Sequence, residues 1–205
     1  MRLIVISNPA EVCDEALIMN DLFAAGLSCL HVRKPDWCEQ QLRAMLKQIR
    51  PEYYRSISLH QHHHLAEMYG IRQLHYTEAA RAQVRPADLV RLQEKGFVLS
   101  TSLHELSRLE ELGLFDYFFF GPVFNSLSKP GYHSRLTPEF SLAGSPRADN
   151  IVALGGVEAA RADSLKAMGF KAAAVLGAIW QKPEKAVATF LELQNLFLDN
   201  TDKDD

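Results

Sequence analysis

The sequence has few cysteines and no excess of positive charge. Its three cysteines, Cys13, Cys29 and Cys38, are an odd number and include no C-x-x-C pair. This argues against a disulfide framework or a thiolate zinc site and favours the reducing cytoplasm. Lys and Arg number 22 against 25 Asp and Glu, which gives a net charge of −3. The chain therefore lacks the basic surface that is typical of nucleic-acid-binding proteins.

Long apolar runs are also missing. The first run, Leu3–Ile6, is short, and no other run approaches the roughly 20 residues that a membrane-spanning helix needs. We therefore expect neither a signal peptide nor a membrane partner. The composition, 47% apolar and 23% charged, is that of a globular protein. We expect one domain over residues 1–198 and a disordered acidic tail over 199–205.

The sequence does contain a regular alternation of short apolar runs with helix-like segments. Nearly all-apolar strands separated by helices are typical of parallel strands covered by helices. Eight such units predict a single (β/α)8 TIM barrel of the α/β class, with a doubly wound open sheet as the alternative. The predicted strands are Leu3–Ser7, Cys29–Arg33, Ile57–Leu59, Gln73–Tyr76, Phe97–Ser100, Tyr117–Phe120, Ile151–Leu154 and Ala172–Leu176. The predicted helices cover 12–25, 38–49, the segment before Gly70, 86–95, 104–112, a short stretch from Pro138, 158–168 and 183–197.

In such a barrel the active residues gather at the carboxyl ends of the strands. The second predicted strand carries two polar side chains there, His31 and Arg33. Strand alternation places both on one face, which we expect to point into the mouth of the barrel. A buried arginine without a partner is costly, so we expect Arg33 to meet an anion. A carboxylate partner within the protein is the alternative.

Polar residues also follow the third and fifth strands. His60 and His64 in the run His60–His64 are four residues apart, so they could share a helix face as metal ligands. A solvated, partly stacked histidine cluster is the alternative, since no Asp or Glu lies within the run. After the fifth strand, Ser102 could cap a helix, or its hydroxyl could reach a phosphate or another polar substrate atom.

The loop after the sixth strand is long for a compact barrel, and such loops are usually functional. It carries Ser126, Ser128 and Lys129. Such a loop can fold over an anionic ligand and place Lys129 on its charge. An ordinary surface loop is the alternative.

Glycines follow the last two strands. Gly155 and Gly156 come after the seventh strand and Gly177 after the eighth. Glycine permits close backbone approach, and barrels often hold a phosphate with these two loops. Together the glycines predict a phosphate-binding cup.

Several of these features, in this order along the chain, resemble a known family. The chain is similar to the thiamine-phosphate synthases and their sister group, the TenI-like thiazole tautomerases, from Leu3 to about Leu193. The residues that carry the resemblance are Arg33, Ser102-Leu103-His104, Asp116-Tyr117, Gly121-Pro122-Val123-Phe124 with Ser126, Ser128 and Lys129, Gly155-Gly156 and Ala178-Ile179.

The resemblance implies a (β/α)8 barrel and a transferase of thiamine biosynthesis. Synthases of this family join a hydroxymethylpyrimidine pyrophosphate to a thiazole phosphate and release pyrophosphate, with Mg²⁺. Arg33 and Lys129 would then meet the pyrophosphate, and Ser102 would lie near the reacting pyrimidine. The thiazole phosphate would be held by Ser126, Ser128 and the backbone N–H groups near Gly156 and Gly177.

The chain departs from the synthase pattern at the residues that bind the metal. Synthases carry an Asn-Asp pair after the third strand, where this chain has His60-Gln61. A further aspartate follows their fourth strand, where Glu78 is the acidic residue of this chain. Because Mg²⁺ prefers carboxylate oxygen, Glu78 is the candidate Mg²⁺ ligand.

Two other functions remain open from the sequence. A metal-free tautomerase would need a general acid or base, and His31, His60 or His104 could supply it. A non-catalytic barrel that binds a phosphorylated thiamine precursor is the third interpretation. All three predict small phosphorylated ligands and leave the oligomeric state open, a homodimer included.

Overall fold

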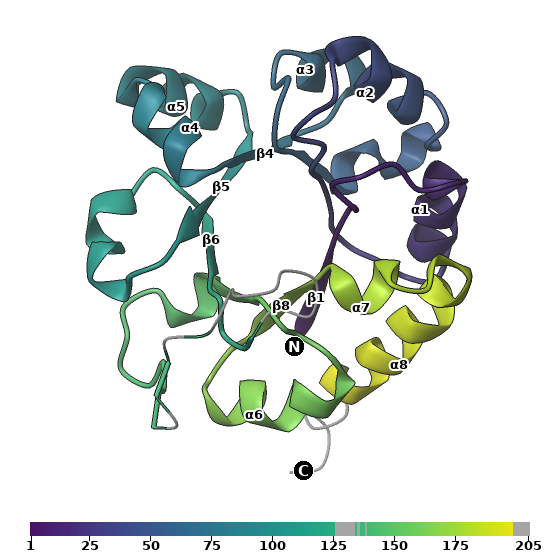
Figure 1. The fold of residues 1–205 in the computed structure, drawn as a ribbon. Helices are drawn as coiled ribbons and strands as arrows, with labels where there is room; N and C mark the ends of the chain where they lie inside the picture. Colours follow the sequence, from purple (N-terminus) through teal and green to yellow (C-terminus); the bar gives the residue numbers. More distant parts are fainter. Residues whose placement is uncertain (126–133, 135, 138, 199–205) are drawn as a thin grey trace.

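The chain folds into a closed barrel of parallel strands in the order β1-β2-β3-β4-β5-β6-β7-β8, which confirms the predicted TIM barrel (Figure 1). The computed structural model describes residues 1–125, 134, 136, 137 and 139–198. The predicted tail lies outside these residues. The strands are β1 Arg2–Ile6, β2 Leu30–Val32, β3 Ile57–Leu59, β4 Gln73–Tyr76, β5 Val98–Leu103, β6 Tyr117–Phe120, β7 Ile151–Leu154 and β8 Ala172–Val175.

Helices surround the strands on the outside of the barrel (Figure 1). The α-helices are α1 Glu15–Ala24, α2 Glu39–Leu46, α3 Leu65–Tyr69, α4 Glu78–Gln83, α5 Pro86–Glu94, α6 Ala162–Ala167, α7 Gly177–Trp180 and α8 Ala186–Leu198. Short 3₁₀ turns complete the ring: η1 Pro51–Ser56, η2 Leu106–Arg108, η3 Glu110–Leu112, η4 Ala148–Asn150, η5 Ala159–Arg161 and η6 Pro183–Lys185. None of the helices in these described segments combines the length and apolarity that crossing a bilayer requires.

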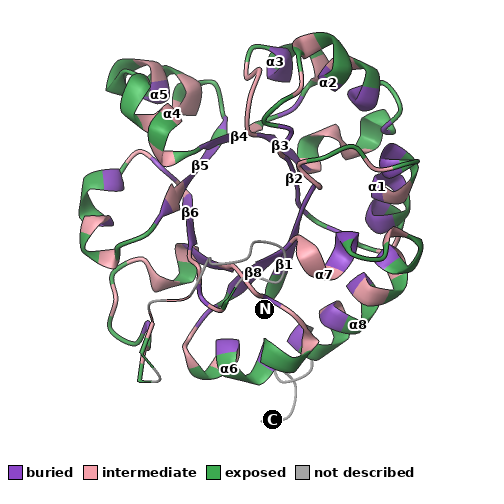
Figure 2. Ribbon diagram, in the orientation of Figure 1, coloured by how far each residue is buried: buried purple, intermediate pink, exposed green. Residues whose placement is uncertain are grey.

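The strands are buried on both faces, as Figure 2 shows by their colour. Strand β6 illustrates the arrangement. Phe118 and Phe120 belong to the apolar cluster that packs with the surrounding helices, whereas Tyr117 and Phe119 belong to a separate cluster inside the barrel. Alternate residues of one strand therefore fill two cores, which explains why the strand sequences are almost continuously apolar.

The segment predicted as a helix at residues 104–112 is instead the two 3₁₀ turns η2 and η3. Its apolar residues, Leu106, Leu109 and Leu112, recur every three residues. That spacing matches the three residues per turn of a 3₁₀ helix, so Leu109 and Leu112 are both buried by this geometry. Helices α4 and α7 are two short elements that the apolar pattern did not predict.

Candidate functional site

Inside the barrel, toward the carboxyl ends of the strands, the side formed by β2 to β5 is polar. Strands β2 to β5 direct histidines and serines inward, and their register places His31 beside Ser58 and His75 beside Ser100. His31, Ser58, His75 and Ser100 are all buried, each at most 1% exposed. The predicted inward orientation of His31 is confirmed, because its ring is enclosed by the other inward-facing side chains.

A chain of hydrogen bonds crosses this interior. The Nε2 atom of His31 lies 2.7 Å from the Tyr117 hydroxyl, and its Nδ1 atom lies 3.0 Å from Nε2 of His60. The opposite ring nitrogen of His60, Nδ1, is buried and has no hydrogen-bond partner among the described residues. The chain of bonds therefore runs from Tyr117 through His31 and ends on an unsatisfied nitrogen of His60.

His75 is held in place from the neighbouring strand. Its Nδ1 lies 2.9 Å from the Ser100 hydroxyl and its Nε2 lies 3.2 Å from the Ser102 hydroxyl. Its ring stacks on that of His60 with centroids 4.1 Å apart. Ser102 belongs to β5, and no helix begins at it. Helix capping by Ser102 was therefore wrong, because the strand extends three residues beyond Ser100 and turns this hydroxyl inward.

Burial keeps the three histidines neutral. It lowers the pKa values of His31 and His60 well below the usual value, and repulsion from His75, were it also protonated, lowers both further. Burial lowers the pKa of His75 to about 3, with contributions from His63 and Arg33. At neutral pH each ring therefore carries one proton and offers one nitrogen lone pair.

Arg33 follows these histidines at the end of β2. Its backbone N–H donates to the Ser7 hydroxyl over 2.8 Å, and that hydroxyl donates back to its carbonyl oxygen over 3.1 Å. The side chain is half-buried and makes no ion pair with any residue that the structure describes. Its charge acts on His60 and His75. The predicted alternative, a carboxylate partner for Arg33, is therefore not found in the described part of the chain.

The side chain of the next residue, Lys34, lies in a different environment. Its side chain is fully buried and forms an ion pair with Glu15 of α1, while also donating to the carbonyl oxygen of Ala10 over 2.8 Å. Burial lowers the pKa of Lys34 and raises that of Glu15, although each supports the charge of the other. Lys34 is thus a structural cation, whereas Arg33 acts electrostatically on both His60 and His75.

Glu78, the candidate Mg²⁺ ligand, and the residues at the family's metal-binding position do not form a site suited to Mg²⁺. The Glu78 carboxylate accepts hydrogen bonds from Arg108 over 2.8 Å and from Arg81 over 3.3 Å, and it lies 3.9 Å from Nε2 of His104. Both arginines meet Oε1, so the carboxylate charge that would attract a hard cation is already neutralised by two positive side chains. At the position of the family's acidic pair stand His60 and Gln61, which offer no carboxylate.

His104 lies at the rim and not in the interior. Its Nδ1 donates to the carbonyl oxygen of Gly121 over 2.7 Å, and half of its side chain is exposed. It connects the loops that follow β5 and β6. Among the candidate bases, His31 and His60 are therefore brought together with His75, whereas His104 is separate from them.

The pairing of His60 with His64 is also not found. His60 points into the barrel, whereas His64 is exposed and its Nε2 lies 2.8 Å from Glu39 of α2. The helix that would align them, α3, begins only at Leu65. Gln61 is half-buried, and its buried Nε2 has no partner in the part of the chain that the structure describes.

The glycines after β6 and β7 let two loops approach each other. The N–H of Val123 donates to the carbonyl oxygen of Leu154 over 2.9 Å, and that of Phe124 donates to Gly155 over 3.0 Å. A Cβ on Gly156 would collide with this loop, and its φ of 63° also favours glycine. These glycines therefore have a packing role, and their role in binding phosphate stays a prediction. Gly177 begins α7.

Three predicted ligand-binding residues, Ser126, Ser128 and Lys129, lie outside the described residues. Sequence reasoning missed His75, Ser100 and Tyr117. The signal was present for two of them. Gln73 and His75 alternate with Leu74 and Tyr76 in β4, which indicates a polar inward face. In β5, Ser100 and Ser102 likewise lie two residues apart, although Thr101 between them is also polar.

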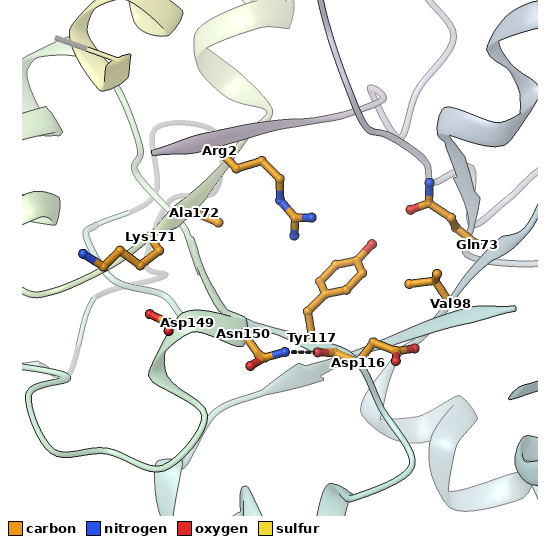
Figure 3. Close-up of a pocket in the computed structure, with 9 residues that line it drawn as sticks. All are labelled: Arg2, Gln73, Val98, Asp116, Tyr117, Asp149, Asn150, Lys171 and Ala172. Carbon is orange, nitrogen blue, oxygen red and sulfur yellow. Dashed lines mark hydrogen bonds between the residues drawn. The ribbon is translucent and has the colours of Figure 1, made fainter. Parts of the chain in front are cut away.

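A separate cavity of about 540 Å³ lies at the amino ends of the strands (Figure 3). Its lining includes the first residues of β1, β4 and β8, Arg2, Gln73 and Ala172. The Arg2 guanidinium lies over the ring of Tyr117, 5.2 Å from its centroid. Conserved chemistry in TIM barrels occupies the opposite end, so this cavity is not the candidate active site.

Comparison with known proteins agrees with the geometry. A family model described as thiamine monophosphate synthase matches residues 3–179. Thiamine phosphate pyrophosphorylase from Bacteroides thetaiotaomicron is 26% identical, with a TM-score of 0.76 over 96% of this chain and 97% of that one. The corresponding protein from Pyrococcus furiosus is 16% identical, with a TM-score of 0.73 over 96% and 95% of the two chains, and shows the shared fold. No curated protein matches the sequence. Because the family model covers most of the barrel, the chain belongs to the thiamine monophosphate synthase family.

Proposed function

We propose that the chain is a transferase of the thiamine-phosphate synthase type. It would join a hydroxymethylpyrimidine pyrophosphate to a thiazole phosphate at the carboxyl end of the barrel. The observation that carries the proposal is Arg33, a half-buried cation at the mouth with no ion-pair partner in the described structure. The family model and the 26% identical pyrophosphorylase support the substrate class.

In this reaction the bond between the pyrimidine methylene carbon and the pyrophosphate oxygen breaks. The leaving pyrophosphate takes the electron pair, and the thiazole nitrogen forms the new bond to carbon. Negative charge therefore builds on the leaving group, and a cation already positioned there lowers the barrier. We assign this role to Arg33, together with Lys129, and we place Ser102 near the pyrimidine because its hydroxyl faces the interior beside His75.

The thiazole phosphate would bind at the other side of the mouth. Ser126, Ser128 and the backbone near Gly156 and Gly177 are its proposed partners. The proposal routes no step through Mg²⁺, because Glu78 is engaged by Arg81 and Arg108.

A second function, a metal-free isomerase of the tautomerase type, is favoured by a different observation. Burial lowers the pKa values of His60 and His75, so at neutral pH they are neutral and their ring nitrogens can hydrogen-bond to a ligand, but the same lowering makes them weak bases. The free Nδ1 of His60 is the atom best placed to exchange a proton with a ligand. The loop glycines and Arg33 would hold the phosphate in either reaction.

The test is an assay of thiamine phosphate formation from the two phosphorylated substrates, with added Mg²⁺ and with EDTA. We expect turnover by the wild type and a loss of roughly 100-fold or more in Arg33→Gln, the effect of removing one charge-stabilising donor. Arg55→Gln is the matched control, because Arg55 is exposed and precedes β3, at the opposite end of the strand from the site. Absence of product under both conditions would reject the synthase proposal. Isomerisation of a thiazole phosphate in EDTA would then support the second function, and binding without any turnover would leave a non-catalytic barrel.

A further inference from the structure

We propose that His31, His60 and His75 form a binding site for a transition-metal cation of the Zn²⁺ class inside the barrel. One ring nitrogen from each of the three lies within 4.8 Å of the other two. They come from β2, from β4 and from the end of β3, which lies between these two strands. Neither the proposed reaction nor the family's Mg²⁺ chemistry uses this set.

The spacing is close to that of a bound metal. Two imidazole nitrogens at about 2.0–2.1 Å from a tetrahedral Zn²⁺ are about 3.3 Å apart. His31 Nδ1 and His60 Nε2 already face each other at 3.0 Å. The third ligand, His75, would approach through Nε2, which now contacts the Ser102 hydroxyl at 3.2 Å. Because the His75 ring stacks on that of His60 with an interplanar angle of 26°, it must turn away from Ser102 to direct Nε2 at the shared metal.

The outer nitrogens of two of these rings are already held as in metal sites. Ligating histidines usually direct their second ring nitrogen to an oxygen atom that fixes the ring. Here Nε2 of His31 meets the Tyr117 hydroxyl at 2.7 Å, and Nδ1 of His75 meets the Ser100 hydroxyl at 2.9 Å. The Ser100 hydroxyl also reaches the carbonyl oxygen of Leu74 at 3.4 Å. His31 Nδ1 is thereby oriented toward His60, whereas His75 Nε2 is directed at the Ser102 hydroxyl.

An independent sign of a missing ligand lies on the same side of the barrel. The described structure leaves three buried side-chain atoms without hydrogen-bond partners: Ser58 Oγ, His60 Nδ1 and Gln61 Nε2. All three belong to β3 or to the residues directly after it. Unsatisfied buried polar atoms are rare in native proteins, and a cluster of them calls for a ligand or ordered water. Because the cation would bind Nε2 of His60, water held at the site, and not the cation itself, would satisfy these three atoms.

The donor atoms select the type of metal. Imidazole nitrogen suits Zn²⁺, Co²⁺, Ni²⁺ and Cu²⁺, whereas Mg²⁺ requires oxygen. The nearby charge of Arg33 opposes any cation, so we expect tighter binding when an anion such as pyrophosphate is present. The inference stands apart from the proposed function, because the metal can be tested alone.

The experiment begins with protein stripped by a chelator and then titrated with Co²⁺ and Zn²⁺. We expect the protein to bind one equivalent of Co²⁺. The bound Co²⁺ should show the visible absorption bands of a low-symmetry site with nitrogen ligands, and Zn²⁺ should displace it. His75→Gln should weaken binding by more than roughly 100-fold, since it removes a ligand and not merely its support. The matched control is the double variant His62→Gln, His64→Gln, which removes two nearby histidines outside the set, half-buried His62 and exposed His64. It should retain full binding.

X-ray absorption on the Zn²⁺-loaded wild type keeps the test independent of variant folding. We expect three imidazole shells at about 2.0 Å. Fewer than two imidazoles, or no metal bound at one equivalent, would overturn the site. Binding that survives His75→Gln but disappears in the His62, His64 double variant would also overturn it, by placing the metal on the surface beside Glu39.

Discussion

The two halves of the barrel interior differ in chemistry. Strands β2 to β5 direct a polar set inward, whereas β6 to β8 and β1 contribute a mostly apolar cluster. The polar set is His31, Ser58, His60, Gln73, His75, Ser100 and Ser102. The apolar cluster contains Ile4, Ile6, Cys29, Tyr117, Phe119, Val152, Ala172 and Ala174, with Leu154 and Leu176 packed against it.

The apolar half packs against the histidines of the polar half and sets their environment. The ring of Phe119 lies against both His31 and His75, with centroids 4.6 and 5.1 Å apart. The apolar half thus provides a packed wall that excludes water from the histidines, and the exclusion lowers their pKa values. The histidines of the polar half therefore stay neutral, even in mild acid, because the apolar half keeps water away from them.

The largest expected effect comes from breaking the apolar wall. Phe119 is 2% exposed, so Phe119→Ala should lower the free energy of unfolding by about 3–5 kcal/mol, the usual cost of a large buried cavity. Urea unfolding followed by circular dichroism measures it. Val98→Ala, at a residue 38% exposed at the start of β5, is the control and should change stability far less. Equal losses of unfolding free energy in the two variants would show that Phe119 contributes no more to stability than an exposed strand residue does.

The next effect is a loss of stability in acid, measured on chelator-treated protein. The unfolded chain binds protons on histidine below about pH 6.5, whereas folded His75 stays neutral down to its pKa of about 3. The unfolded state therefore binds more protons, and stability falls as the pH drops through this window. For His75 alone the loss between pH 6.5 and 5 is about 2 kcal/mol.

His75→Gln should flatten this pH dependence, because glutamine does not titrate. His64→Gln is its control, since His64 is 60% exposed. A wild-type stability that is constant between pH 6.5 and 5 would contradict the dry, neutral state of the polar half.

A smaller effect should follow from cutting the link between the two halves. Tyr117→Phe removes the hydroxyl that meets His31 at 2.7 Å, and we expect a loss of about 1 kcal/mol. Tyr53→Phe is a matched control, because the Tyr53 ring stacks on Phe23 at the outside of the barrel. The comparison of thermal unfolding midpoints isolates the hydrogen bond. If Tyr117→Phe is no less stable than Tyr53→Phe, the hydroxyl does not support His31.

The sequence predicted the barrel well because each strand and helix carries its own local signal. The apolar signal was misleading for inward-facing polar residues, because each strand faces the core under the helices on one side and the barrel interior on the other. Gln73–Tyr76 reads as an apolar run, so His75 was missed, although its alternation with Leu74 and Tyr76 marks an inward polar position. The prediction of inward His31 succeeded by the same rule.

Contacts that depend on register were beyond the sequence. Ser102 meets His75 only because β5 pairs with β4 in a register that sets His75 beside Ser100. His60 and His64 share a sequence run but not a face, since α3 begins after both. No spacing rule shows that Glu78 is held by Arg108, which is 30 residues away.

The smallest expected effect concerns the rim of the polar half, where charges are solvated. Glu78 is 43% exposed and pairs with Arg81 and Arg108, so Glu78→Gln should change the free energy of unfolding by less than about 1 kcal/mol. If the carboxylate only organises these arginines, the Mg²⁺ dependence of any turnover should also stay unchanged. Glu111→Gln, at the neighbouring residue that also contacts Arg108, is the control. An abolished Mg²⁺ response in Glu78→Gln alone would return this carboxylate to the metal site and make the rim, not the histidine interior, the chemical centre of the polar half.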